Sequence, residues 1–70
     1  MASWPSSKAS RVLKALQRIG WVIKRTSGSH RTLEREGFED VVFAHHDGEE
    51  LGPVMLGKIA KKTGLTPDDL

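Results

Sequence analysis

The sequence predicts an α+β domain of the order α-β-β-β-α, in which two helices cover one face of a three-stranded antiparallel sheet. Three observations support this prediction. Apolar residues recur at helical spacing near both ends of the chain, in residues 8–19 and 53–63. Three short β-prone runs lie between these segments and are separated by turns that contain glycine. Because the connections between the runs are short, neighbouring strands are expected to be antiparallel.

The first helix is expected to begin after Ser7, acting as its N-cap, and to stop at Gly20. Its apolar side follows the i, i+3, i+4, i+7 spacing and consists of Ala9, Val12, Leu13, Leu16 and Ile19. Its polar side carries a basic stripe made of Lys8, Arg11, Lys14 and Arg18. Such a stripe is typical either of a solvated helix face or of a surface that meets phosphates.

Three strands are expected, over residues 21–26, 30–35 and 38–44. Since successive side chains of a strand point to opposite faces, Arg25 is predicted to share a face with Trp21 and Ile23. The same alternation places His30, Thr32 and Glu34 on one face of the second strand, opposite Arg31, Leu33 and Arg35. Trp21 in the first strand and Phe43 in the third are interpreted as core residues.

The second helix is expected to follow a polar loop at residues 45–50, with Pro53 in its first turn. Gly64 is predicted to end this helix. Lys61 and Lys62 lie in the last turn, where their positive charge interacts favourably with the negative end of the helix dipole. Its buried face is expected to consist of Leu56, Ile59, Ala60 and Thr63. Thr66 is expected to cap a final short turn.

The 70 residues are enough for one small domain, predicted to span residues 8–70 behind a flexible leader at residues 1–7 in which Trp4 is exposed. The sequence has no cysteine, which excludes a disulfide framework and a thiolate metal site. It has neither a signal-peptide pattern nor an apolar run approaching the roughly 20 residues of a membrane span. A cytoplasmic protein without membrane contact is therefore expected.

The formal net charge of +2 conceals an uneven distribution. Residues 1–35 carry eight lysines or arginines and one acid, whereas residues 36–57 carry six acids and neither lysine nor arginine. A basic half indicates a polyanionic partner, unless it is simply a solvated surface. The acidic segment would limit indiscriminate binding or meet a basic protein.

The candidate site is the turn Gly28-Ser29-His30, with Lys24, Arg25 and Arg31 close by in the sequence. Histidine gains or loses a proton near neutral pH. Phosphodiester chemistry requires a proton-transfer group set among fixed positive charges. His30 can supply the proton transfer and the basic residues the charge. The plainer alternative is a surface histidine beside arginines.

His45, His46 and Asp47 suggest metal ligands at first sight. Adjacent residues in an extended chain point to opposite faces, and no further ligand at metal-site spacing completes a set. No metal and no other cofactor is therefore expected. His46 is interpreted as a residue that supports the loop or the site.

Several short motifs occur in an order and spacing typical of one family. They are Gly20-Trp21, Arg25, Gly28-Ser29-His30, His46, the apolar residues Leu51, Leu56 and Ile59, and Gly64-Leu65-Thr66. In this set the chain resembles the HicA mRNA interferase toxins of bacterial type II toxin–antitoxin pairs, from about Ser7 to Leu70. It departs from the family pattern at Ala44, Glu49, Val54 and Thr63.

The resemblance implies a small ribonuclease that cleaves mRNA, with His30 as its catalytic residue and a HicB-type antitoxin that covers the site. The layout is also that of double-stranded-RNA-binding domains. RNA contacts are predicted for Lys8, Arg11, Lys24, Arg25, Ser29 and Arg31, and supporting roles for Gly28 and His46.

Two other functions remain open on the sequence. The chain could be a non-catalytic RNA-binding module of the same fold, in which basic residues only hold phosphates. It could also be an inactive relative that retains only the binding of its antitoxin. A pure binder needs no titratable group at position 30, so His30 separates these alternatives from the enzyme.

Overall fold

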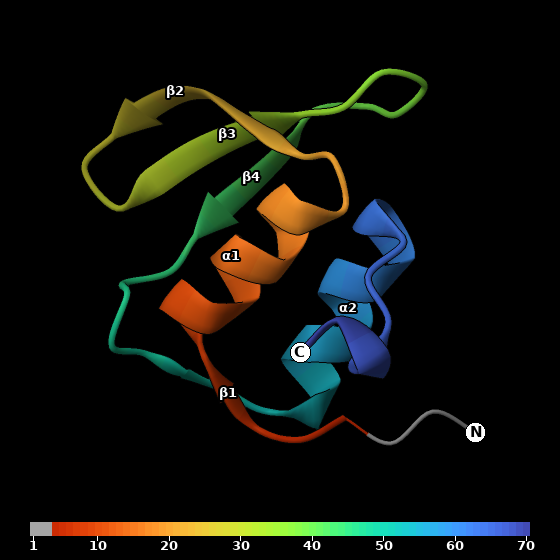
Figure 1. Ribbon diagram of the computed structural model, residues 1–70. Helices are drawn as coiled ribbons and strands as arrows, with labels where there is room; N and C mark the ends of the chain where they lie inside the picture. The colour runs from red at the N-terminus through yellow and green to blue at the C-terminus, as the bar shows by residue number, and fades with distance from the viewer. Residues whose placement is uncertain (1–3) are drawn as a thin grey trace.

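Residues 4–70 are described by a computed structural model, in which two helices lie on one face of a three-stranded antiparallel sheet (Figure 1). Along the chain these elements are α1 (Ala9–Arg18), β2 (Val22–Ser27), β3 (His30–Glu34), β4 (Val41–Ala44) and α2 (Pro53–Thr63). The sheet order is β2-β3-β4, so each strand pairs with its neighbour in sequence. The predicted α-β-β-β-α fold is confirmed.

A second, two-stranded sheet was not predicted. It pairs β1 (Ser7–Lys8) with β5 (Glu50–Leu51), and Ser7 is buried opposite Leu51. Ser7 is therefore not the N-cap of α1: Lys8 holds that position, and no side chain caps the helix. The prediction was wrong because the first amides of α1 are satisfied by a distant loop. Ala9 N–H donates to the Glu49 carbonyl at 2.8 Å, and Ser10 N–H donates to the Asp47 carbonyl at 3.1 Å.

The predicted boundary between leader and domain runs through β1. Ser7 belongs to the folded unit, and Trp4 is partly buried against the hydrophobic core rather than exposed. The apolar side chains that pack on the core therefore include Trp4, which precedes the basic stripe in the sequence. The remainder of the predicted leader, residues 1–3, lies outside the described residues.

The end of α1 confirms the stop predicted at Gly20. This residue has a φ of 110°, which a glycine adopts readily. Its N–H donates to the Gln17 carbonyl at 3.2 Å, and the N–H of Trp21 donates to the Leu16 carbonyl at 3.0 Å. These two bonds form a Schellman motif, and they turn Trp21 back onto the core beside Leu16.

A bulge in β2 corrects the predicted face of Arg25. Ile23 pairs with Leu33, but Arg25 pairs with Thr32, so the register shifts at Lys24. An extra residue reverses the alternation beyond it. Arg25 therefore lies on the face opposite to Ile23, whereas strict alternation placed the two together.

The third strand begins at Val41, three residues later than predicted. Phe38 lies in the preceding turn, where its N–H donates to the Arg35 carbonyl at 3.0 Å. Its ring packs edge-on against Trp21 at a centroid distance of 5.3 Å, and the Arg35 guanidinium lies 4.8 Å from the ring centroid. These contacts hold Phe38 outside the strand, although its side chain is still 43% exposed.

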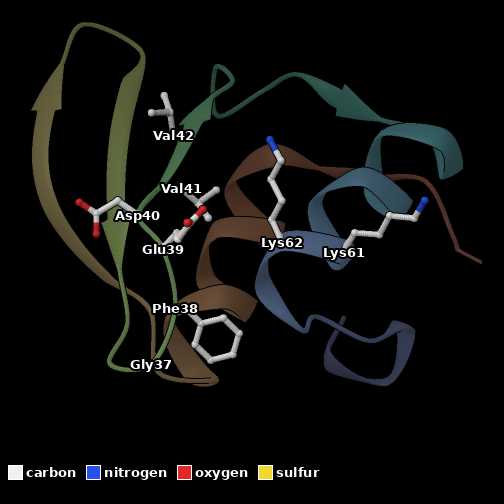
Figure 2. A pocket seen from close by; sticks show the side chains of 8 residues that line it. All are labelled: Gly37, Phe38, Glu39, Asp40, Val41, Val42, Lys61 and Lys62. Carbon is white, nitrogen blue, oxygen red and sulfur yellow. The ribbon is translucent and has the colours of Figure 1, made fainter.

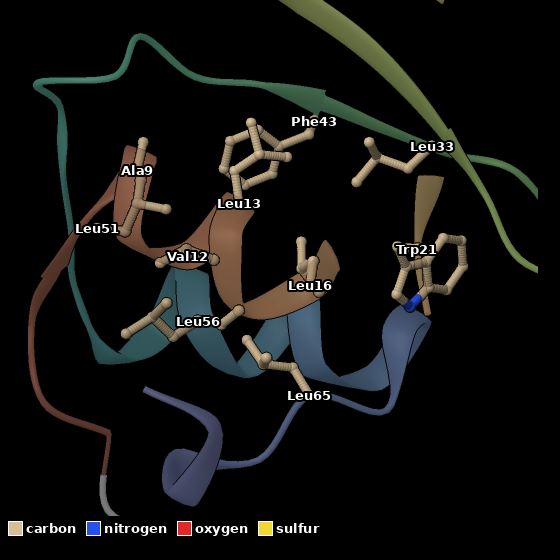
Figure 3. Packing of buried hydrophobic residues seen from close by; sticks show 11 residues of the cluster. Ala9, Val12, Leu13, Leu16, Trp21, Leu33, Phe43, Leu51, Leu56 and Leu65 are labelled. Carbon is tan, nitrogen blue, oxygen red and sulfur yellow. The ribbon is translucent and has the colours of Figure 1, made fainter. Parts of the chain in front are cut away.

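The core lies between the sheet and the two helices (Figure 3). Trp21 and Phe43 are buried as predicted, together with Leu16 of α1, Leu33 of β3 and Leu56 of α2. On α2, Leu56 and Thr63 are fully buried, whereas the other two predicted positions, Ile59 and Ala60, are partly buried.

Thr63 joins the end of α2 to the start of β2. Trp21 Nε1–H donates to the Thr63 carbonyl at 3.1 Å, and Thr63 Oγ1–H donates to the Ile59 carbonyl at 2.8 Å. Gly64 then ends α2 with a φ of 77°, as predicted. Thr66 caps the final 3₁₀ turn η1 (Pro67–Asp69), also as predicted.

Two members of the basic stripe hold this carboxyl-terminal segment. Arg11 donates to the Leu70 carbonyl at 3.1 Å, and Arg18 donates to the Asp69 carbonyl. The basic stripe is therefore not a continuous surface on which all four side chains are available to a polyanion. Lys8 and Lys14 are exposed on the same helix side and make no ion pair within residues 4–70.

Trp21→Phe is expected to destabilise the fold by about 2–4 kcal/mol, because it leaves a cavity and deprives the buried Thr63 carbonyl of its donor. Val22→Ala is the matched control, since Val22 is the next residue along the chain and is 60% exposed. Urea denaturation followed by circular dichroism measures both variants. Equal midpoints for the two variants would contradict the anchoring role of Trp21.

Candidate functional site

His30 is the first residue of β3 and follows the two-residue turn Gly28-Ser29. Ser27 and His30 pair across the turn. Gly28 has a φ of 59°, whereas Ser29 has no positive φ. Positive φ at the first central residue alone defines a type II′ turn, whose twist suits a hairpin. The turn thus fixes the register of His30 at the tip of the hairpin.

The side chain of His30 lies on the sheet face that neither helix covers. Leu33 points to the helices and is fully buried, so alternation along β3 places His30 on the opposite face, where it is exposed. Ser27 of β2 and Ala44 of β4 lie directly opposite it on the same face. A large substrate can therefore reach the imidazole without any movement of a helix.

The bulge brings Arg25 onto this same face. Arg25 pairs with Thr32, which is one position along the face from His30. Such diagonal neighbours have Cβ atoms about 7–8 Å apart, within reach of a long side chain. The structure thus gives His30 one cationic companion, Arg25, and this pairing depends on the extra residue at Lys24.

Arg31 lies on the other face of the hairpin, because it is adjacent to His30 in the strand. It lines an open hollow with Gly28, Ser29, His45, His46 and Asp47. Its Nη1 atom is 3.2 Å from Asp47 Oδ1, is buried, and makes no hydrogen bond within the described residues. The predicted residues Gly28, Ser29, Arg31 and His46 are therefore brought together, but beside His30 rather than around its side chain.

The side chain of Lys24 forms an ion pair with Asp40 rather than lying beside His30. Lys24 is three residues before Ser27, which pairs with His30, and its Nζ lies 2.9 Å from Asp40 Oδ2. This hydrogen bond to the carboxylate raises the pKa of the Lys24 ammonium above its ordinary value. Two other predicted RNA contacts, Lys8 and Arg11, lie on β1 and α1, and Arg11 holds Leu70.

The hollow also contains His45 and Asp47, for which no RNA contact was predicted from the sequence. His45 Nδ1 lies 3.1 Å from Glu49 Oε2, and its ring packs edge-on against Phe43 at 5.0 Å. The hydrogen bond with His45 lowers the pKa of the Glu49 carboxyl below its ordinary value. His45 thus stabilises the loop after β4, while Asp47 faces Arg31. The i, i+4 spacing of His45 and Glu49 was the only signal in the sequence.

Within residues 4–70, no three side chains of histidine, cysteine, aspartate or glutamate gather closely enough to hold a metal ion. His45 and His46 both line the hollow, and His45 pairs with Glu49. The same residues include no helix long and apolar enough to cross a membrane.

Comparison with protein families settles the relationship of this chain to known proteins. The family model described as the HicA toxin of bacterial toxin–antitoxin pairs matches residues 9–65. The chain belongs to the HicA toxin family. It is therefore a toxin of a toxin–antitoxin system, and the matched region includes α1, the whole three-stranded sheet and α2. No individually curated protein matches the sequence.

Gly28→Ala in this HicA-family chain is expected to cost about 1–2 kcal/mol of stability, because a Cβ disfavours the left-handed backbone. No atom lies within 4 Å of the added Cβ, so a steric clash does not contribute. Gly48→Ala is the matched control: its site is equally open, but its φ is not positive. Thermal melts measure both, and an unchanged Gly28→Ala melting temperature would contradict the assigned turn.

Proposed function

We propose that this HicA-family toxin is an endoribonuclease that cleaves mRNA by acid–base catalysis, with His30 as the catalytic residue and no metal. The observation that carries the proposal is the placement of His30. It is exposed on the uncovered sheet face, fixed by a type II′ turn and accompanied by Arg25. Nothing in the core requires a titratable group there.

The chemistry follows from the groups on this face. The imidazole of His30 removes the proton of the RNA 2′-hydroxyl or donates one to the leaving 5′-oxygen, steps worth about 10²–10⁴-fold. The guanidinium of Arg25 stabilises the negative charge that develops on the phosphorus-bound oxygens, worth roughly 10²–10³-fold. The nucleophile belongs to the RNA, so the protein needs no nucleophile of its own.

The hollow beside the turn supports a second part of the proposal. Arg31 and Ser29 line it together with His46, and the Arg31 Nη1 atom lies 3.2 Å from Asp47 Oδ1 but makes no hydrogen bond within the described residues. We assign this hollow to a phosphate next to the cleaved bond, with Gly28 holding the turn and His46 supporting the loop. Lys8, Arg11 and Lys24 would contact RNA only farther along its strand.

The proposed inhibitor is a HicB-type antitoxin. The face that bears His30 has no lid within residues 4–70, since both helices lie on the other side of the sheet (Figure 1). A protein that occupies this face blocks RNA directly, and acidic groups on it would speed the encounter with Arg25. Action on mRNA places the toxin in the cytoplasm.

His30→Gln is expected to abolish cleavage of a long single-stranded transcript, with EDTA present throughout. Glutamine keeps the size and the hydrogen-bonding capacity of the side chain but cannot exchange a proton at neutral pH. Gln17→Ala, at an exposed position on α1 away from the open sheet face, should cleave at the wild-type rate. Equal cleavage by His30→Gln and wild type would contradict the catalytic role of His30, whereas RNA binding without cleavage by the wild type would favour the non-catalytic RNA-binding module. Cleavage that is lost in EDTA and restored by a divalent ion would contradict the metal-free mechanism.

Arg25→Gln is expected to weaken RNA binding and to reduce the dependence of log affinity on log salt concentration by about 0.7, the value for one phosphate contact with a single strand. Lys58→Gln is the control, because Lys58 is an exposed cation on α2, across the core from the open face. Fluorescence anisotropy over a salt series measures both slopes. The assignment of Arg25 fails if the two variants show the same slope.

A further inference from the structure

The outer edge of β4 is a free strand edge. The sheet order ends at β4, and no described strand pairs with its other side. Ser27 and His30 flank a two-residue turn and so form a hydrogen-bonded pair, which makes Arg31 and Phe43 the next such pair, across β3 and β4. The backbone groups of Val42 and Ala44 then point away from the sheet. Each offers one N–H and one C=O to an additional strand.

This edge lacks the features that protect the opposite edge. β2 carries a bulge at Lys24 and the charge of Arg25, both of which discourage pairing with another chain. β4 consists of Val41, Val42, Phe43 and Ala44, with no charge and no proline. Val42 is 59% exposed on the open face. An apolar, unprotected edge of this kind is suited to pairing with a further strand.

A groove runs beside this edge (Figure 2). Its strand side is formed by residues 37–42, including Phe38, Val41 and Val42, and its helix side by Lys61 and Lys62 of α2. Both lysines are exposed, and neither makes an ion pair within residues 4–70. On the strand side, Asp40 is paired with Lys24, whereas Glu39 is exposed and makes no ion pair within residues 4–70. The groove therefore combines a strand edge, apolar walls, two lysines on its helix side and the Glu39 carboxylate on its strand side.

We propose that β4 binds an extended, acidic segment of a partner protein by strand addition along this groove. Side chains of an added strand alternate between the two faces of the sheet. Those on the helix side meet Lys61 and Lys62, which selects glutamate or aspartate. Those on the open side pack beside Val42, which selects β-branched apolar residues. The proposal does not depend on His30 or on RNA cleavage.

Two other occupants fit less well. RNA would meet the lysines but leaves the backbone N–H and C=O groups of Val42 and Ala44 and the apolar wall without suitable partners. A second copy of this chain would present Val41–Ala44, which has no acidic side chain. Asp40, just before this strand, is paired with Lys24, which leaves Glu39 of that copy to meet the two lysines. An acidic β-strand satisfies the strand edge, the apolar walls and the two lysines.

The test uses a short, end-capped peptide of alternating glutamate and valine, titrated into the full chain labelled with ¹⁵N. Amide shifts are expected at Val42 and Ala44 and in the last turn of α2. Lys61→Glu combined with Lys62→Glu should weaken binding roughly tenfold, since two favourable surface ion pairs become repulsive. Lys58→Glu is the matched control on the same helix, outside the groove lining, and should bind nearly as well as wild type.

A peptide with N-methyl groups at alternate residues separates strand addition from simple charge attraction. One of its two methylation registers should lose binding, because it removes the hydrogen bonds to the edge while keeping every charge. Equal binding of both methylated peptides, or of a lysine–valine peptide, would overturn the proposal. So would shifts at Val42 and Ala44 that appear on raising the protein concentration alone, because these would show self-association. None of these results bears on the His30→Gln cleavage assay.

Discussion

A three-stranded sheet has two faces, and two short helices can cover only one of them. This constraint shapes the rest of the molecule. Leu33 and Phe43 supply the covered face and belong to the same buried cluster as Leu16 of α1 and Leu56 of α2, while alternation sends their neighbours to the open side. His30, Arg25 and Val42 are exposed for that reason. The same strands therefore present core residues on one face and the residues of the candidate site on the other.

Trp21 connects this sheet to both helices. The Schellman motif at the end of α1 turns it inward, and its indole N–H donates to the carbonyl of Thr63 at the end of α2. Phe38 packs edge-on against the indole, and the Arg35 guanidinium lies over the Phe38 ring. One residue thus couples the ends of both helices to the start of the sheet. In a chain of 70 residues with a small core, such shared anchors carry much of the cooperativity.

The distribution of charge in the folded molecule differs from that along the chain. Basic residues that cluster in the amino-terminal half take separate tasks: Arg11 and Arg18 hold the carboxyl-terminal segment, Lys24 pairs with Asp40, and Arg31 faces Asp47. Acidic residues of the middle segment neutralise two of these cations. Arg25 is left on the open face with His30, and Lys61 and Lys62 are left beside the edge of β4. The proposed RNA surface is centred on His30 and Arg25, whereas the proposed strand-binding surface follows the outer edge of β4 and meets the open face at Val42.

Several features are predictable from the amino-acid sequence alone: the order of the elements, the glycine stops at Gly20 and Gly64, the hairpin turn before His30 and the burial of Trp21 and Phe43. These features depend on local backbone preferences and on apolar periodicity, which are properties of neighbouring residues. Other features arise only when the chain is folded. They are the β1–β5 pairing that removed Ser7 from its predicted cap, the bulge that moved Arg25 beside His30, and the partners of Lys24, Arg11 and Arg31. Each of these depends on contacts between segments far apart in the chain. A single extra residue in a strand reverses every face beyond it, and no local pattern in the sequence marks where it occurs.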